Sequence, residues 1–455
     1  MPGQGAFRAA SLANLVEPSV DQRPSRVPLP EGTIPVGIGL LIAGVASFAF
    51  FRVGTDALGE DGFVPLQNLW FATFALAPGF FLPLEQELGR ALSHRRAHQQ
   101  GGRPVAAKVL RLGILLAGVV LVAIALLSPL ITSNYFDGDW VMLIALMLAF
   151  LAYMPAHLSR GVTSGQGRFH AYAVVLGADG VMRIILCVAL AAIGITTAGP
   201  FGFAVAISPL FGVAWVAWRH QLRTDPGPPA DWNEVTPNLG WLLLGSVCAA
   251  ALVNAGPVAA NILAAPDQAA LVTAFGKGVL LARIPLFLFQ AVQAALLPRL
   301  SRLAARNELD EFRGGFRKLV YIVAGVGIIG TLGAYVLGPF IVQKMYEVDL
   351  GRRTMAMLAL GSALYMVALA LAQAVIALSG HSLVAVGWTI GLVTFVVVTW
   401  LAGPDLFKRV EIALVVSSLA ALVAFAISLR VKLHAGARPT ADSMFEAFTD
   451  MPLET

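Results

Sequence analysis

Three ionisable residues lie deep inside long apolar stretches of the sequence: Asp179, Arg183 and Arg283. A charge is costly in apolar surroundings, so each is a candidate functional residue. Asp179 and Arg183 are four residues apart, which places them on one face of a helix, where they can pair. Arg283 has a planar guanidinium whose donors suit phosphate oxygens. We expect these groups to meet in a cavity that binds a phosphate-bearing substrate. The alternative is that the first two only neutralise each other, while the third binds a carbonyl freed by Pro285.

Three further polar residues extend the candidate substrate-binding set: Lys277, Arg52 and Asn254. Lys277 lies in the same stretch as the deep arginine, nearer its predicted outer end. Arg52 ends the first apolar stretch, where it can reach the membrane surface or face the mouth of a cavity. Asn254 lies in the run VNAGPVAANIL, in which Gly256 and Pro257 predict a broken or bent helix. This run is either a hinge or a packing feature.

A candidate cytoplasmic gate follows Pro83 and consists of Glu85, Glu87 and Arg90. The spacing of Glu87 and Arg90 permits an ion pair within one helical turn. An ordinary ion pair at the membrane interface explains the same residues, so both interpretations stay open.

Metal and cofactor sites are not indicated. His94 and His98 are four residues apart, but they lie among arginines with no suitable third ligand nearby. The two cysteines, Cys187 and Cys248, are both in apolar stretches, which makes a disulfide framework improbable. We expect no bound metal, no cofactor and no catalytic residues.

The elements that must position these residues are membrane-spanning helices. Of the 455 residues, 58% are hydrophobic and only 13% are charged, against about 25% charged in soluble domains. Apolar stretches of about 20 residues, the length that crosses a bilayer, recur along the chain. We expect an all-α, polytopic membrane protein with about twelve spans in the plasma (inner) membrane. The predicted spans are 34–53, 63–84, 109–131, 140–157, 171–193, 200–218, 239–263, 270–297, 317–341, 354–378, 382–401 and 410–431.

The distribution of charge predicts the orientation. Basic residues cluster after the second and eighth spans, whereas the connections after the first and third spans are acidic. Because basic loops stay in the cytoplasm, both termini are expected there. The same rule explains the pI near 9.4, so no nucleic-acid partner is expected.

An internal repeat organises the spans. Pro83 and Pro298 each end a span before a basic segment, and Gly165 and Gly380 each follow a span; both pairs are 215 positions apart. This shift lays the first six spans over the last six, which predicts two parallel six-helix repeats. The predicted divisions are a disordered tail at 1–33, repeats at 34–223 and 239–431, a cytoplasmic linker at 224–238 and a disordered tail at 432–455.

Two segments resemble a known superfamily, that of the multidrug, oligosaccharidyl-lipid and polysaccharide exporters. The run ARIPLFLFQAVQAALLPRLSRLAARNE is similar to the eighth-span signature of its polysaccharide and lipid II flippases, with Arg283, Pro285, Pro298 and Ser301 at the matching positions. The run GQGRFHAYAVVLGADGVMRI is similar to the start of the fifth span in the polysaccharide (O-antigen type) branch. The resemblance covers most of residues 34–431.

The resemblance implies a V-shaped pair of six-helix bundles that moves a polyprenyl-linked saccharide to the outer leaflet by alternating access. It would assign the substrate phosphates to Arg283, with membrane lipids and the glycosyltransferases or polymerase of the same pathway as partners. Two features depart from the group: twelve spans are fewer than lipid II flippases have, and the seventh span has no acidic residue. The alternatives are a multidrug or cation extruder and a membrane glycosyltransferase or polymerase, which would need catalytic groups in a sizeable outer loop.

Overall fold

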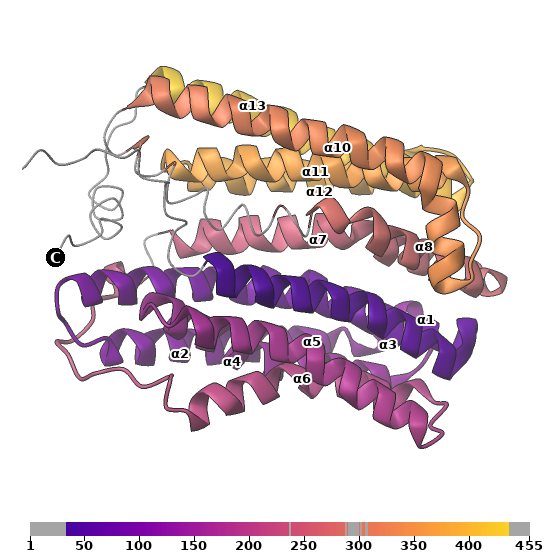
Figure 1. The fold of residues 1–455 in the computed structure, drawn as a ribbon, viewed down its shortest axis with the longest axis horizontal. Helices are drawn as coiled ribbons and strands as arrows, with labels where there is room; N and C mark the ends of the chain where they lie inside the picture. Colours follow the sequence, from indigo (N-terminus) through magenta and orange to yellow (C-terminus); the bar gives the residue numbers. More distant parts are fainter. Residues whose placement is uncertain are drawn as a thin grey trace, which may run out of the picture. The chain divides into compact units, whose positions relative to one another are not determined.

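The computed structural model describes residues 33–435 except 236–237, 287–288, 290–299, 301–302 and 305–307. The predicted tails, Pro298 and Ser301 therefore lie outside the described residues. All regular elements of the described part are helices, and the long ones run side by side (Figure 1). Their bounds are α1 Thr33–Ala97, α2 Arg103–Leu126, α3 Ser128–Tyr135, α4 Trp140–Gly165, α5 Phe169–Ala192, α6 Ala198–Trp218, α7 Leu239–Leu263, α8 Ala269–Ala282, α10 Leu309–Tyr346, α11 Arg352–Ala377, α12 His381–Leu401 and α13 Leu406–Ala435, with short 3₁₀ turns η1 Trp232–Glu234 and η2 Pro266–Gln268.

Helix α1 contains the first two predicted spans. Its helical geometry is interrupted at Gly59, which has φ 75° and ψ 171°, a conformation that glycine adopts without steric cost. The chain folds back there, because the ring centres of Phe51 and Phe71 lie only 5.9 Å apart, whereas twenty helical residues would span about 30 Å. Gly54 fits against Phe63 at this turn, where a Cβ atom would approach the ring to 2.4 Å.

Eleven helices of the described part are long and apolar enough to cross a membrane. Because α1 folds back on itself, they provide twelve crossing segments, as the sequence predicts. The all-helical, multi-pass membrane architecture is thus confirmed.

The same packing order occurs in each half of the chain. In the first half, α5 packs against α1 and α6, and α4 also packs against α6; in the second, α12 packs against α7 and α13, and α11 also packs against α13. Helices of residues 33–218 lie together, as do those of residues 239–435 (Figure 1). The limits of the two predicted repeats remain predictions.

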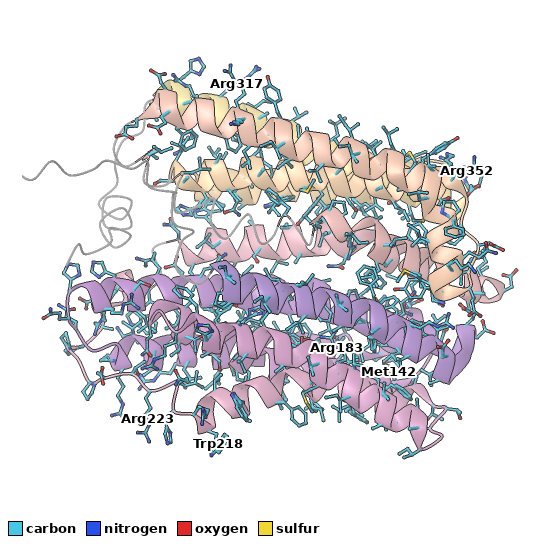
Figure 2. All side chains as sticks on the ribbon, in the orientation of Figure 1. Met142, Arg183, Trp218, Arg223, Arg317 and Arg352 are labelled. Carbon is cyan, nitrogen blue, oxygen red and sulfur yellow. The ribbon has the colours of Figure 1, made fainter. Side chains whose placement is uncertain are left out.

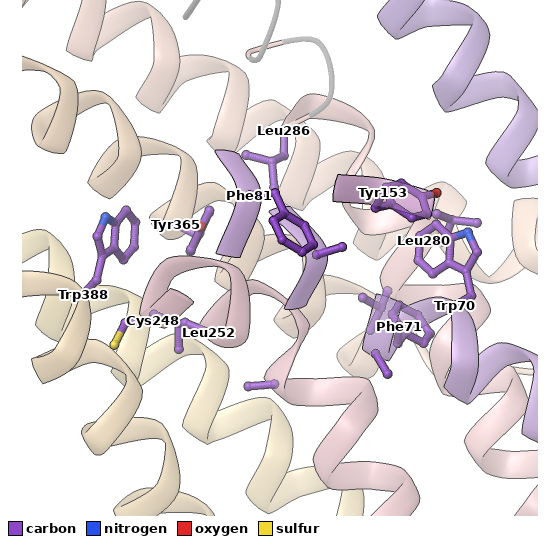
Figure 3. Close-up of a cluster of buried hydrophobic side chains, with 14 of the residues drawn as sticks. Trp70, Phe71, Phe81, Tyr153, Cys248, Leu252, Leu280, Leu286, Tyr365 and Trp388 are labelled. Atoms are coloured by element: carbon purple, nitrogen blue, oxygen red, sulfur yellow. The ribbon is translucent and has the colours of Figure 1, made fainter. Parts of the chain in front are cut away.

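A continuous apolar core joins the two halves. The second segment of α1 contributes Trp70, Phe71 and Phe81, and the second half contributes Leu252 and Trp388, among many others. Figure 3 shows these side chains on neighbouring helices. The candidate substrate-binding residues therefore lie among closely packed apolar side chains.

Several helix limits differ from the predicted ones. Helix α4 begins where Asp139 accepts hydrogen bonds from the backbone N–H groups of Val141 and Met142, and it continues to Gly165 rather than ending at 157. Helix α8 ends at Ala282, because Pro285 cannot donate the hydrogen bond that would continue the helix. Helix α7 continues through Pro257, so of the expected break or bend the structure excludes a break; Gly256 packs against Leu414.

Candidate functional site

Asp179 and Arg183 form a buried ion pair within the first half. The Arg183 guanidinium donates to the Asp179 carboxylate at 2.7 Å. The same carboxylate accepts hydrogen bonds from the Tyr153 hydroxyl at 3.0 Å and the Ser208 hydroxyl at 2.7 Å. Helices α4, α5 and α6 thus meet at one carboxylate. The predicted pairing is confirmed, and the two hydroxyl partners are new.

Arg183 is only 2% exposed, and Figure 2 shows it among the helices, away from the peripheral arginines such as Arg317. Its guanidinium carbon lies 4.9 Å from the centre of the Phe74 ring and 5.9 Å from that of Phe50. Its Nε and Nη1 make no hydrogen bond within the described residues. The aromatic faces therefore supply part of the stabilisation that water would otherwise give.

Arg283 lies where α8 ends, and its guanidinium binds α7. It donates to the Asn254 side-chain carbonyl at 2.9 Å and to the backbone carbonyl of Val253. The Val253 carbonyl is four residues before Pro257, so no helical N–H reaches it. The alternative in which Arg283 binds a freed carbonyl is thus right in kind, but Pro257 rather than Pro285 frees that carbonyl.

Asn254 links the two halves of the chain. Its amide donates to the carbonyl of Ala250 at 3.0 Å and to that of Phe74 in α1 at 3.4 Å. The Phe74 carbonyl is four residues before Pro78 and lacks a helical donor for the same reason. Asn254 and Arg283 together thus satisfy carbonyls that prolines leave free in both α7 and α1.

A small pocket adjoins Arg283 within the second half. It is lined by Ser362, Tyr365 and Ser418 and by apolar residues of α7, α8, α11 and α13. The pocket has room for about one water molecule. A saccharide cannot enter it in this arrangement of the helices.

Lys277 is fully buried and binds the turn of α1. Its ammonium lies 2.9 Å from a carboxylate oxygen of Glu60 and 5.6 Å from the centre of the Tyr346 ring. The structure places Lys277 beside the connection of the first two predicted spans, but the sequence gave no reason to choose Glu60 among the several acids of that connection.

Arg52 also joins the halves at the predicted outer end. It donates to Asp56 at 2.9 Å, to Glu347 at 2.8 Å and to the carbonyl of Met345 at 3.0 Å. Its side chain is 39% exposed, as expected for a residue that reaches the surface. Nearby, the Asn68 amide donates to Asn261 at 2.7 Å.

Glu85 belongs to a second buried polar cluster of the first half. Its carboxylate lies 2.8 Å from His157, 2.9 Å from Arg160 and 2.9 Å from the Tyr172 hydroxyl. Arg160 was not expected here because the predicted fourth span ended at 157, and His157 and Tyr172 meet Glu85 only through the packing of the helices. The extension of α4 to Gly165 brings Arg160 back onto a helix beside Glu85.

Arg90 pairs with Glu87 at 2.8 Å, as the spacing predicts. Arg90 also donates to the backbone carbonyl of Glu234 in the linker at 2.8 Å. The Glu234 carboxylate in turn binds Arg95 at 2.6 Å. These contacts connect the first half with the linker, and the role of Glu85, Glu87 and Arg90 as a cytoplasmic gate remains a prediction.

The structure does not gather the predicted substrate-binding residues into one cavity. Arg183 and Asp179 lie within the first half, Arg283 and Asn254 lie at the contact of α7 and α8 with α1, and Lys277 lies nearer the outer end. The Arg283 guanidinium lies against the Phe71 ring, at 5.7 Å, one helical turn from the Phe74 ring that Arg183 contacts. Aromatic side chains of α1 therefore stand beside both arginines.

Metal-ligand clusters of three or more His, Cys, Asp or Glu side chains do not occur in the described part of the chain. The His94 and His98 rings stack at 4.4 Å, and both cysteines are free and buried.

Comparison with known proteins identifies the fold. No family model matches the chain. Two uncharacterized mycobacterial proteins, one of Mycobacterium tuberculosis and one of Mycobacterium bovis, are each 26% identical to it over 398 residues, covering 84% of this chain and 86% of theirs.

Solved structures of MATE transporters match most of the chain. An outward-facing multidrug resistance MATE transporter of the MOP superfamily has a TM-score of 0.65 at 14% identity, covering 89% of this chain and 95% of that one. The inward-facing form has a TM-score of 0.65 at 13% identity, covering 90% and 97%. A Vibrio cholerae MATE transporter in the bent form has a TM-score of 0.61 at 15% identity, covering 88% and 97%. The chain has the MATE transporter fold.

The MATE fold agrees with the resemblance at the level of the superfamily's architecture. The polysaccharide branch, the cargo and the roles of individual residues are matters of proposal.

Proposed function

We propose that this protein is a flippase that moves a polyprenyl-(pyro)phosphate-linked saccharide from the inner to the outer leaflet by alternating access. In this proposal it serves the assembly of a cell-surface polysaccharide or the cell wall, and it performs no covalent chemistry. Its partners are the lipid-linked saccharide, membrane lipids and the glycosyltransferases or polymerase of the same pathway.

The observation that carries the proposal is that Arg283 is a buried cation with neutral partners. It is 6% exposed, it lies at a break in α8, and within the described residues its polar contacts are with neutral groups of α7. A buried cation without a counter-ion retains its full charge for a ligand, and arginine suits phosphate. Breaks in membrane helices are also where transporters commonly place their substrate sites.

The small size of the pocket supports alternating access. A saccharide that reaches Arg283 needs the two halves to separate, since the pocket holds about one water molecule. The contacts that would have to part at the outer end are polar: Lys277 with Glu60, and Arg52 with Glu347.

A multidrug or cation extruder is the second candidate, because several solved neighbours are multidrug resistance transporters. Such cargo would need an acidic site. Asp179 is the deep carboxylate of the first half, and it is already bound by Arg183, Tyr153 and Ser208. Because its carboxylate already has these three partners, Asp179 is not available to a cationic cargo, which favours an anionic one.

The decisive experiment is depletion of the protein, followed by analysis of lipid-linked sugars in the native cell. We expect one lipid-linked intermediate to accumulate in the inner leaflet. Complementation with Arg283→Ala should fail, while Arg283→Lys should restore part of the export because it keeps the positive charge. An unchanged pool of lipid-linked sugars after depletion would refute the proposed cargo.

The matched control is Arg317→Ala, which removes an exposed arginine of α10. It should complement fully at an equal amount of protein in the membrane. Normal surface glycan in cells that carry only Arg283→Ala would refute the assigned role of Arg283 and leave the depletion result to judge the cargo.

A further inference from the structure

A close contact between α8 and the turn of α1 surrounds Lys277. Its ammonium is 0% exposed and lies 2.9 Å from Glu60. One helical turn earlier, the Thr273 hydroxyl donates to the backbone carbonyl of Glu60 at 3.2 Å. Both contacts join a residue of the second half to the turn that connects the first two spans.

The contact is tightly packed. The Gln67 amide donates to the carbonyl of Val272 at 3.1 Å, and a Cβ atom on Gly276 would approach the Gln67 side chain to 2.5 Å. Glycine at 276 thus leaves room for the Gln67 side chain to lie against α8. No space therefore remains beside Lys277 for a second anion while this contact is closed.

Two other acids at this end share a different cation. Arg52 binds Asp56 at 2.9 Å and Glu347 at 2.8 Å. Glu60 is the carboxylate that pairs with Lys277 in the described part of the chain. Separation of α8 from the α1 turn would thus remove the counter-ion of a fully desolvated ammonium.

We propose that Lys277 is an anion-binding station that exchanges the Glu60 carboxylate for the acidic group of the cargo when the outer ends of the two halves separate. This inference rests on the proposed function and adds a second phosphate contact beyond Arg283. Leaving one member of a buried ion pair unpaired is strongly unfavourable. An anionic cargo removes that cost, because its phosphate oxygens accept charge-assisted hydrogen bonds from the ammonium. Cargo charge thereby couples release of Glu60 to opening.

A cysteine cross-linking reporter can follow this opening. In the full chain with Cys187→Ser and Cys248→Ser, the changes Asn68→Cys and Asn261→Cys place thiols on two side chains that touch across the halves, at 2.7 Å. A short bis-thiosulfonate, which bridges two thiols several ångströms apart, then measures closure of the outer end by cross-linking in proteoliposomes. The probe is a polyprenyl monophosphate, and the matching uncharged polyprenol is the ligand control.

The polyprenyl phosphate should lower cross-linking in the reporter chain, while the polyprenol should not. Glu60→Gln alone should lower cross-linking without any probe, because it leaves Lys277 unpaired. The double variant Glu60→Gln with Lys277→Gln should regain closure through a neutral amide pair, yet require about tenfold more polyprenyl phosphate, or more, to open. Lys277→Arg should keep the response.

A double variant that opens at the same probe concentration as the reporter chain would show that Lys277 is only a structural partner of Glu60. A reporter chain that does not respond to the polyprenyl phosphate would also refute the exchange. Neither result bears on the depletion experiment, which judges the proposed function separately.

Discussion

The buried charges of the two halves are satisfied in different ways. In the first half, Arg183 pairs with Asp179, and Arg160 lies 2.9 Å from Glu85. In the second half, Arg283 binds a side-chain amide and a backbone carbonyl, both neutral. The deep arginines of the first half are therefore neutralised by carboxylates of the same half, whereas Arg283 of the second half keeps its positive charge at the contact with α1.

This difference separates a structural from a ligand-binding use of arginine. A matched pair in an apolar interior is costly to break, but it offers little field to a ligand. An arginine with neutral partners exchanges them for an anion at a gain in electrostatic energy. Changes in charge should therefore affect mainly stability in the first half and mainly export in the second.

The largest effect on stability should come from Asp179→Asn. The change leaves the Arg183 charge buried without its acid, so we expect the free energy of unfolding to fall by about 3–5 kcal/mol. Thermal unfolding of the purified protein and the amount found in the membrane would measure it. The double variant with Arg183→Met removes both charges and should recover most of the loss. Equal instability of the single and double variants would contradict the assigned pairing.

A second change should give the buried arginine of the second half a carboxylate partner, as in the first half. Asn254→Asp puts a carboxylate next to Arg283, where the Asn254 oxygen now lies at 2.9 Å. We expect export to fall about tenfold or more, because the neutralised arginine no longer attracts the cargo phosphate. Export assays at equal protein level would measure this.

Asn254→Ala is the matched control. Both variants lose the hydrogen bonds that the Asn254 amide donates to the carbonyls of Ala250 and Phe74, which should lower the free energy of unfolding by about 1–3 kcal/mol. Only the aspartate adds a charge. The alanine variant should therefore export more than the aspartate variant. The opposite order would mean that the positive charge of Arg283 is not what the cargo recognises.

The sequence could predict the helices well, because a span of twenty apolar residues and a charged connection are both local signals. The pairs Asp179–Arg183 and Glu87–Arg90 were predictable for the same reason, since each lies within one or two helical turns. Long-range partners were not predictable: Glu60 for Lys277, or the Val253 carbonyl for Arg283, follows only from how helices pack.

Two further errors have a physical cause. Gly256 and Pro257 suggested a broken or bent helix, yet α7 is unbroken, because the Arg283 guanidinium satisfies the carbonyl that Pro257 frees. The expectation of one shared cavity failed because α1 places aromatic side chains beside both arginines.

The smallest predicted effect concerns the linker, which extends the comparison to the segment between the halves. Arg95 is 3% exposed; it binds Glu234 through two nitrogens, at 2.6 and 2.9 Å, and also the carbonyls of Pro228 and Pro229. The hydrogen bond from Arg95 lowers the pKa of Glu234 below its ordinary value. A carboxylate with a lowered pKa stabilises the folded state above its unfolded pKa, near 4.3, and this contribution disappears as the pH falls through the folded pKa.

Glu234→Gln should therefore reproduce at neutral pH the loosening that acid causes in the wild-type linker. Since Arg95 keeps its carbonyl partners, we expect the contact to lose only about 1 kcal/mol of stabilising free energy. Hydrogen exchange of residues 224–235 should become several-fold faster, with that of α7 unchanged, because the clamp ties the linker to the first half. Asp225→Asn, at an exposed acid of the same segment, is the control and should leave exchange unaltered. Faster exchange in α7 would show that the clamp holds the second half as well.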